Sequence, residues 1–203
     1  MAGKGLLVVF SGPSGAGKGT VLRALRKQNP GIRLSVSATT RAPRPGETDG
    51  REYYFMTREK FKRMAENGGM LEFAEYCGNC YGTPAAPIER WTSEGTDVIL
   101  EIEVQGGAQV QRKRPDVVSI FILPPSLAEL RRRLKKRGTE PAGVVRSRLE
   151  TARKEIAQAG RYDYVVVNDS VEEAAARVGA ILRAEKCRTC RNEQLMEGML
   201  QHD

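Results

Sequence analysis

The sequence predicts an α/β protein in which helices cover both faces of a parallel β-sheet. Short apolar runs typical of buried strands alternate along the chain with longer stretches typical of helices. A glycine-rich turn at residues 12–17 joins the first apolar run to the first helical stretch, a strand–turn–helix unit expected in such a sheet. Residues 38–90 interrupt the alternation with short strand-like runs and one helical pattern, so we expect them to form a small insertion.

Composition and charge limit the classes of function. The chain has 203 residues, 40% hydrophobic and 29% charged, which suits a single globular domain. Its net charge of +8 favours anionic partners such as nucleotides, nucleic acid or an acidic membrane surface. We expect a cytoplasmic protein without a membrane segment, because no apolar run approaches the ~20 residues of a span. The single histidine, His202, argues against hydrolysis by a Ser-His-Asp or Cys-His arrangement.

The first strand and the first helix flank the glycine-rich turn. Residues 6–10 are an apolar run that predicts a buried strand. The helix after the turn should end near Gln28, because the residue before a proline avoids the helical conformation and residues 29–31 are Asn-Pro-Gly. Residues 33–37 alternate between apolar and polar side chains and predict the next strand.

The insertion is predicted to hold short strands and one helix. Thr57 is a suitable N-cap for that helix, and the two glycines at residues 68–69 should end it. Strand-like runs lie at residues 53–55, 71–76 and 81–83, the last two around a turn at 77–80.

The second half of the chain returns to the alternation of core strands and helices. Three further apolar runs predict strands at residues 97–103, 118–123 and 164–167. Ser126 should cap the helix that follows the second of them. Residues 142–158 predict a long charged helix with little apolar face, residues 171–186 an amphipathic helix, and residues 187–203 a polar tail.

The glycine-rich turn has the composition of a phosphate-binding loop. Glycines let backbone N–H groups converge on phosphate oxygens, and the following helix N-terminus adds its positive dipole end. Lys18 is placed to reach the β- and γ-phosphates of a nucleotide. The next position holds Gly19 where the general motif has Ser or Thr, so a direct bond from the Thr20 hydroxyl to Mg²⁺ stays open. A glycine-rich turn without a ligand is the alternative.

A proline-rich loop carries two arginines three positions apart. Arg41 and Arg44 lie among the prolines at positions 43 and 45. Two guanidinium groups on one stiff segment suit bidentate capture of a phosphate group. Spacing alone supports equally well two solvated arginines on a surface loop, so both interpretations remain at this point.

Several segments resemble the guanylate kinase family in sequence and in order. They are residues 12–18, 35–44, 50–55, 81–83, 101–106, 137–139 and 167–169. The resemblance covers roughly residues 5–186 and implies a kinase that transfers a phosphoryl group from ATP to GMP with Mg²⁺. It also implies the three-layer architecture of a P-loop kinase. Its parts would be a core at about 1–37, 91–136 and 160–186, a GMP-binding insertion at 38–90, a helical lid at 137–159 and a tail at 187–203.

The resemblance implies roles for residues on the ATP side. The implied ATP-binding residues are Gly12, Pro13, Ser14, Gly15, Ala16, Gly17, Lys18, Gly19, Thr20, Asn168 and Asp169. The implied groups around the transferred phosphoryl group are Lys18, Arg41 and the two lid arginines, Arg137 and Arg148. Positioning and charge neutralisation by such groups are the main requirements of phosphoryl transfer. Glu101 would order water molecules around Mg²⁺.

The resemblance also implies roles on the GMP side. The implied ligands of the GMP phosphate are Arg41, Arg44, Tyr53 and Tyr81. Glu72 would accept hydrogen bonds from the N1–H and N2–H₂ donors of guanine, while Ser37 and Thr83 would meet the remaining polar edge. Glu101 and Glu103 complete the implied set. The family usually has aspartate at position 103, so the contact made by the longer Glu103 stays open.

Residues 130–137 form a polybasic run with three interpretations. A basic run can bind nucleic acid, but no aromatic stacking platform accompanies this one. The helical spacing of Leu127, Leu130 and Leu134 makes the charges a solvated helix face instead. The resemblance explains part of the run as the start of the lid.

Two other functions compete with GMP phosphorylation. Guanylate-kinase-like domains in some scaffold proteins bind partner proteins without catalysis, but their phosphate loops are damaged, whereas Lys18 is present here. A kinase for another nucleoside monophosphate such as AMP is disfavoured by Glu72, because adenine lacks the donors that a carboxylate requires.

The four cysteines form two Cys-x-x-Cys pairs to which the family gives no role. Cys77 and Cys80 lie in the insertion, and Cys187 and Cys190 lie just past the last helix. Such pairs suit a four-thiolate Zn²⁺ site if the fold brings them together, and four free thiols are the other main interpretation, so both stay open at this point. Disulfides are disfavoured in a reducing compartment.

Overall fold

The central sheet follows the alternation of apolar strands along the chain. The computed structural model describes residues 3–136 and 142–200, and within them the sheet has five strands, all parallel. In order across the sheet they are β2 (Arg33–Leu34), β7 (Val98–Glu101), β1 (Leu7–Ser11), β8 (Val118–Leu123) and β9 (Tyr164–Val167). The predicted parallel α/β sheet is therefore confirmed.

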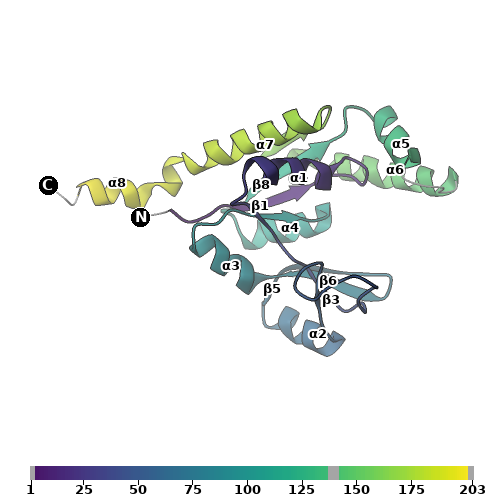
Figure 1. The fold of residues 1–203 in the computed structure, drawn as a ribbon, viewed down its shortest axis with the longest axis horizontal. Coiled ribbons are helices and arrows are strands. Elements are labelled where there is room, and N and C mark those ends of the chain that lie inside the picture. Colours follow the sequence, from purple (N-terminus) through teal and green to yellow (C-terminus); the bar gives the residue numbers. More distant parts are fainter. Residues whose placement is uncertain (1–2, 137–141, 201–203) are drawn as a thin grey trace.

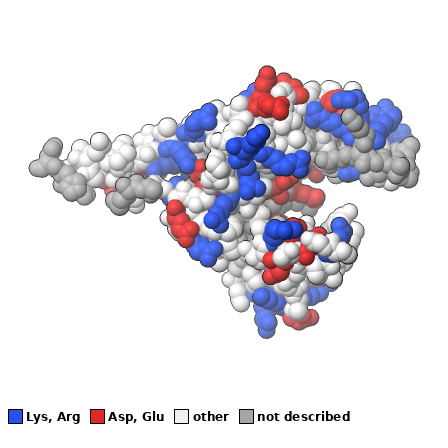
Figure 2. Space-filling model, in the orientation of Figure 1, with Lys and Arg blue, Asp and Glu red and all other residues white. Residues whose placement is uncertain are grey.

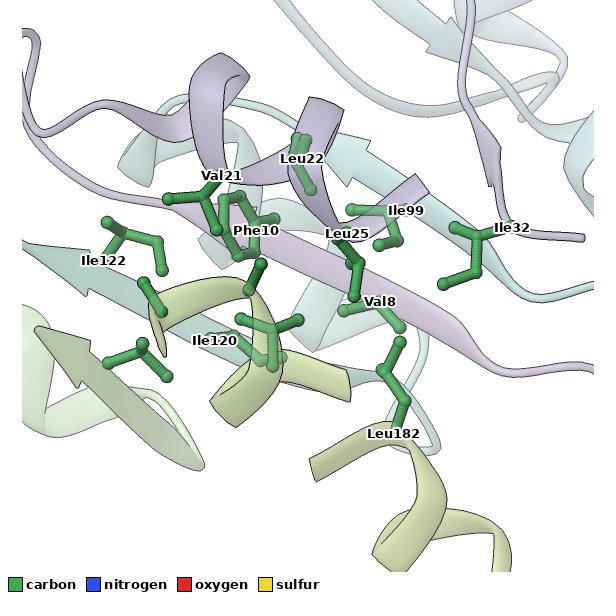
Figure 3. Packing of buried hydrophobic residues seen from close by; sticks show 14 of the residues in the cluster. Val8, Phe10, Val21, Leu22, Leu25, Ile32, Ile99, Ile120, Ile122 and Leu182 are labelled. Atoms are coloured by element: carbon green, nitrogen blue, oxygen red, sulfur yellow. The ribbon is translucent and has the colours of Figure 1, made fainter. Parts of the chain in front are cut away.

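Helices cover both faces because successive side chains of β1 point in opposite directions. Val8 and Phe10 contact a buried cluster on the face covered by α1 (Lys18–Gln28) and α7 (Val171–Lys186). Leu22 of α1 and Leu182 of α7 belong to this cluster (Figure 3). Leu7 and Val9 belong to a second cluster on the opposite face, under α3 (Ala85–Ser93) and α4 (Val104–Lys113). The result is the predicted three-layer core.

The carboxyl ends of the parallel strands lie along one edge of the sheet, where ligands bind in folds of this kind. The glycine-rich turn follows β1, Glu101 ends β7, and Asn168 follows β9. Because β1 lies beside β7 and β8, these segments are brought near one another although they are far apart in sequence.

The insertion forms a second sheet below the core (Figure 1). In order its strands are β4 (Tyr54–Phe55), β3 (Ala38–Thr39), β6 (Asn79–Pro84) and β5 (Met70–Tyr76), with α2 (Arg58–Glu66) packed on it. Thr57 caps α2 by accepting a hydrogen bond from the Lys60 N–H, as predicted. Phe61 of α2 packs with Ala38 and Met70. The insertion therefore has a small core of its own.

The two lid-side helices pack on each other at one end of the molecule (Figure 1). They are α5 (Leu127–Lys136) and α6 (Ala142–Ile156). The Glu129 N–H donates to the Ser126 side chain, which confirms the predicted cap. The prediction that residues 142–158 have little apolar face is wrong, because Val145 and Ala152 are buried with Leu130 and Leu134. The apolar face was overlooked because the side chain of Ala152 is short, and the helical pattern is recognised mainly from large apolar residues.

The structure adds two core helices that the sequence pattern did not predict. One is α3, which packs Ile88 and Trp91 on the core sheet although it begins inside the predicted insertion. The other is α4, whose Gly106-Gly107 pair hides the helical pattern. A Cβ on Gly106 would lie 2.9 Å from Glu72 Oε2, so the glycine is required by close packing against the insertion.

Two other segments differ from the prediction. The strand predicted at residues 33–37 stops at Leu34, and the chain crosses to the second sheet, where Ala38 begins β3. The predicted polar tail contains α8 (Glu193–Leu200), which projects beyond the core and exposes Leu195, Met199 and Leu200 (Figure 1). Among the described residues, no helix is both long enough and apolar enough to cross a membrane.

Candidate active site

The glycine-rich loop between β1 and α1 folds as a tight turn around its own lysine. Lys18 is the first residue of α1, and its Nζ donates to the Gly12 carbonyl at 2.6 Å. Gly17 has φ of +93°, a conformation that L side chains rarely adopt. A Cβ at Gly17 would also lie 2.3 Å from the Asn168 side-chain nitrogen. The loop therefore requires glycine at this position for both backbone and packing reasons.

Asn168 and Arg133 hold the loop from behind. The Asn168 side chain is buried and its Nδ2 donates to the Ala16 carbonyl at 2.7 Å. Arg133 of α5 donates from Nη2 to the Asn168 carbonyl at 3.0 Å and from Nη1 to the Ala16 carbonyl at 3.3 Å. Its Nε donates to Glu129, which fixes the guanidinium on its other side. The loop is thus attached to β9 and α5 as well as to its flanking elements.

The polar residues after β9 have separate environments. Asn168 faces the loop, whereas Asp169 is half exposed and accepts from the Ser170 N–H at the start of α7. That backbone hydrogen bond is the largest influence lowering the pKa of Asp169, and Arg177 contributes further. Of the two, Asn168 is the residue in direct contact with the phosphate loop.

Two oxygen donors lie at the beginning of α1. Glu101 ends β7 directly beside β1, and its carboxylate would lie 3.7 Å from a Cβ placed on Gly19. Thr20 is exposed in the same turn, and its Oγ1 accepts from Arg23 at 3.4 Å. A carboxylate and a hydroxyl are donors of the type that Mg²⁺ prefers.

The arginine loop of the insertion forms a compact polar cluster. The Arg41 guanidinium lies 5.5 Å from the Tyr53 ring centroid and 5.8 Å from that of Phe55. The rings of Tyr53 and Tyr81 are 6.1 Å apart in an edge-on arrangement. Arg44 is exposed on the same loop. The structure therefore brings the predicted phosphate ligands of the insertion together.

A buried carboxylate lies between the insertion and the core. Glu72 of β5 is 7% exposed, and Thr83 of the neighbouring strand β6 donates from Oγ1 to Glu72 Oε1 at 2.6 Å. Burial raises the pKa of Glu72, while the Thr83 hydroxyl and the charge of Lys113 partly oppose that shift. A charged group in such a place is costly unless it has a partner, so a donor-bearing ligand explains its presence. Ser37 is half buried beside β3.

Two further acids lie near the site, and only the first of them was predicted from the sequence. Glu103 precedes α4 and is exposed. Glu155 of α6 was not singled out, although it lies seven positions, two helical turns, after Arg148 and so shares its face. Burial raises the pKa of Glu155. The positive charge of Lys18 lowers this pKa, and the negative charge of Glu103 raises it. Glu155 is therefore an acid that faces the site from the lid.

The lid reaches the phosphate loop through an arginine. Arg148 of α6 donates from Nη2 to the Ser14 hydroxyl at 2.9 Å. The second predicted lid arginine, Arg137, lies outside the described residues. A hollow lies between the lid side of the core and the insertion (Figure 2). The contacts of Arg41 with Tyr53 and Phe55 are made within the insertion.

The predicted zinc site shared by both cysteine pairs is wrong. Cys77 begins the turn between β5 and β6, whereas Cys187 follows α7 at the side of the molecule from which α8 projects (Figure 1). All four cysteines are free thiols, and the described residues contain no group of three or more His, Cys, Asp or Glu side chains that could hold a metal ion. Helix α7 places the second cysteine pair away from the insertion, so the two pairs do not approach each other.

In the polybasic segment, two arginines form ion pairs and the leucines between the basic residues are buried. Arg132 and Arg133 both pair with Glu129, and these contacts lower the pKa of Glu129 to about 2. Leu130 and Leu134 on the same helix are buried. The run is thus a charged face of a packed helix, as the helical spacing predicted.

Comparison with known proteins identifies the family. The family model for guanylate kinase matches residues 4–185. Guanylate kinases from Desulfitobacterium hafniense (strain Y51) and Lactococcus lactis subsp. lactis (strain IL1403) are 52% and 55% identical to the chain. The alignments cover 96% and 94% of this chain and 98% and 93% of those proteins.

Solved structures agree with this assignment. The crystal structure of guanylate kinase from Anaplasma phagocytophilum matches with a TM-score of 0.74 at 39% identity, covering 99% of this chain and 98% of that one. A shikimate kinase from Bacteroides thetaiotaomicron, only 14% identical with a TM-score of 0.50, shares the fold alone. Because the family model and relatives of more than half identity both span nearly the whole chain, this chain belongs to the guanylate kinase family.

Proposed function

We propose that this chain transfers the γ-phosphoryl group of ATP to GMP, giving ADP and GDP, and that it accepts dGMP as well. Membership of the guanylate kinase family supports the reaction. The observation that carries the choice of base is the buried Glu72–Thr83 pair. Only a base with adjacent donors compensates a buried acceptor of this kind, and guanine presents them. The assigned contacts involve phosphate and base, not the ribose, so both sugars should be accepted.

On the GMP side, we assign the phosphate to the cluster of the insertion. Its ligands would be Arg41, Arg44, Tyr53 and Tyr81, which combine two charged forks with two neutral donors. Glu72 would accept from guanine N1–H and N2–H₂, and Thr83 and Ser37 would meet the other polar atoms of the base. Glu101 and Glu103 would complete the site from the core side.

On the ATP side, we assign the triphosphate to residues 12–20. Lys18 would contact the β- and γ-phosphates, and Asn168 would keep the loop in the binding conformation. Asp169 would lie beside the adenine. Guanylate kinases use ATP with Mg²⁺, and a Mg²⁺ ion fits at the start of α1, where Glu101 and Thr20 supply hard oxygen donors. Bound there, the ion would neutralise phosphate charge.

The proposed mechanism is charge neutralisation with alignment. No general base is needed, because the acceptor is an ionised phosphate. Lys18, Arg41 and Arg148, joined by Arg137 from outside the described residues, would surround the transferred group. The insertion at about 38–90 and the lid at about 137–159 would close on the core at about 1–37, 91–136 and 160–186, leaving 187–203 as a tail. Closure would exclude water and so suppress ATP hydrolysis.

The competing functions have less support. A protein-binding scaffold domain would not need the contacts that hold Lys18 and the loop. An AMP kinase would leave Glu72 facing a ring nitrogen without a donor. Nucleic-acid binding has little support, because part of the basic run pairs with Glu129. A cytoplasmic location remains our proposal, on the ground that ATP and GMP are available there.

A coupled assay of ADP release against GMP, AMP, CMP and UMP tests the function. We expect GMP to be preferred to AMP by roughly a thousandfold or more in kcat/KM, because a site built for hydrogen bonds rejects analogues that lack them. Comparable values for AMP and GMP would overturn the guanine assignment. Absence of turnover with every acceptor, together with intact folding, would favour the binding-module alternative.

A further inference from the structure

A carboxylate that the sequence did not single out lies inside the arginine cluster of the insertion. Glu47 follows Arg41 and Arg44 on the same loop. Its Oε1 accepts from Arg41 Nη2 at 2.9 Å, and its Oε2 accepts from the same nitrogen at 3.0 Å. The side chains of the pair are only 15% and 18% exposed. A contact this enclosed constrains the guanidinium more than an ordinary surface ion pair does.

Arg41 is held on every side except one. The Glu47 carboxylate accepts hydrogen bonds from Nη2, and the Ala42 carbonyl accepts one from Nη1 at 2.7 Å. One face of the guanidinium is near the rings of Tyr53 and Phe55. A guanidinium has five N–H donors, more than the Glu47 and Ala42 contacts use, and Tyr81 interacts with the same side chain. The arginine is therefore oriented before any phosphate arrives.

The same carboxylate also sets the backbone at Arg44. Glu47 Oε2 accepts from the Arg44 N–H at 2.7 Å. This backbone hydrogen bond is the largest influence lowering the pKa of Glu47, and Arg41 lowers it further against some desolvation. Glu47 is therefore ionised at neutral pH, and one anionic group fixes the Arg41 guanidinium relative to the backbone at Arg44.

We infer that Glu47 is a positioning residue for the monophosphate group of the acceptor nucleotide. This inference rests on the proposed function, which assigns that phosphate to Arg41 and Arg44. A long, flexible arginine side chain loses conformational freedom when it binds a phosphate, and ordering that of Arg41 in the free enzyme lowers this cost. The contact with the Arg44 N–H holds the backbone from which the second arginine projects. Glu47 should therefore act mainly on GMP affinity, with a smaller effect on the chemical step through Arg41 and little effect on ATP.

Glu52 supplies a matched control on the same loop. It accepts from the Thr48 N–H at 2.8 Å and pairs with Arg51 at 2.7 Å, but it has no contact with either phosphate arginine. Glu47 and Glu52 thus make the same kinds of contact, and only Glu47 makes them with Arg41 and Arg44. A difference between Glu47→Gln and Glu52→Gln reports on the arginines and not on general loop order.

The test compares wild type, Glu47→Gln, Glu47→Asp and Glu52→Gln in steady-state kinetics with GMP and ATP. For Glu47→Gln we expect the KM for GMP to rise about tenfold, the size of one charge-assisted hydrogen bond. The KM for ATP should change less than about threefold, and kcat should fall by a smaller factor than the KM for GMP rises, because Arg41 also faces the transferred group. Glu47→Asp keeps the charge and should recover part of the loss. Glu52→Gln should match wild type within about twofold.

Several outcomes would overturn the inference. An unchanged KM for GMP in Glu47→Gln would show that the arginines need no positioning, and a lowered KM would show that Glu47 competes with phosphate. Equal losses in Glu47→Gln and Glu52→Gln, with lowered thermal stability, would reduce Glu47 to a general structural role. Calorimetric GMP binding by the same proteins separates this inference from the function. Wild type that binds GMP without turnover contradicts only the kinase, and wild type that does neither contradicts both.

Discussion

At the scale of single residues, Glu72 shows a conflict between stability and recognition. Its carboxylate is buried, and in the free protein Thr83 is its hydrogen-bond donor. Burial raises its pKa, so the charged form is disfavoured in the folded state. A residue with this environment is more easily explained by a ligand than by the fold.

Glu72→Gln should weaken GMP use and stabilise the free protein above neutral pH. The folded pKa of Glu72 lies above its unfolded value, so its favourable contribution is present below the unfolded pKa and lost as pH rises through the folded pKa. The variant removes that loss, and its melting temperature should exceed that of wild type at pH 8 by more than at pH 5. The kcat/KM for GMP should fall roughly tenfold to a hundredfold.

Glu75→Gln on the same strand is the control for this prediction. Glu75 is exposed and pairs with Arg58, so its variant should show neither the pH-dependent stabilisation nor the kinetic loss. Calorimetric melting at the two pH values and kinetics with GMP and AMP provide the measurements. A melting-temperature difference that grows toward acid would contradict the assigned cause of the pKa shift.

Lys18→Ala should abolish most turnover while leaving the fold intact. Lys18 begins α1, and its Nζ donates to the loop carbonyl of Gly12. Loss of a charged contact to the phosphates should cost roughly 1.5–3 kcal/mol or more, which is tenfold or more in kcat. Lys27→Ala, at an exposed position on the same helix, is the control. A Lys18→Ala enzyme with more than about a tenth of wild-type kcat would refute the role.

At the scale of elements, the phosphate loop is positioned by helices and strands that are distant in sequence. Asn168 follows β9 and Arg133 belongs to α5, and both donate to the Ala16 carbonyl. The glycines make the turn sterically accessible, but these hydrogen bonds select one conformation from those that glycine allows. Binding by the loop therefore depends on the packing of α5.

Arg133→Gln should raise the KM for ATP about tenfold, because it removes hydrogen bonds worth about 1 kcal/mol each from the loop support. Arg132→Gln is the matched control: Arg132 pairs with the same Glu129 but is 69% exposed and makes no contact with the loop. The KM for GMP should be unchanged in both variants. Equal effects of the two substitutions would assign the result to Glu129 or to helix α5 in general.

At the scale of the whole molecule, the predicted site residues are divided between the insertion, the core and the lid-side helix α6. The arginine cluster lies on the insertion, Lys18 on the core, and Arg148 on the lid-side helix α6. The insertion packs on α4 of the core, and a hollow lies between the insertion and the lid side of the core (Figure 2). In-line transfer requires reacting atoms about 3–3.5 Å apart, so these bodies must approach when both nucleotides bind.

Small-angle scattering should detect this closure as a smaller radius of gyration with GMP and a non-hydrolysable ATP analogue than in the free protein. GMP alone should give part of the change, because it engages the insertion first. Arg41→Ala should respond less to GMP, since the insertion would lose its main charged contact. An unchanged radius with both ligands bound at saturation would show that the free protein is already in the catalytic arrangement.

The sequence by itself determined the main strands of the core sheet and the phosphate loop. Apolar runs marked β1, β7 and β8 because strands buried on both faces must be apolar wherever they pack, and β9 was marked by a similar run although it lies at the sheet edge and exposes Val165 and Val167. The glycine-rich turn was visible for a similar reason, since its backbone conformation constrains which residues can occupy it. The motif residues that resemble guanylate kinase could also be identified from the sequence, because each motif is a short continuous segment.

Only the tertiary structure decided which distant residues meet. Arg133 and Glu47 look like ordinary surface charges in the sequence, and their placement depends on the packing of α5 and on the turn of the arginine loop. Helix α4 was hidden because Gly106 makes room for Glu72, which lies in another subdomain. The cysteine pairs failed to meet because α7 carries one of them away. Periodicity reports the burial of a segment, whereas a contact between segments depends on how the elements pack, and no single segment encodes that.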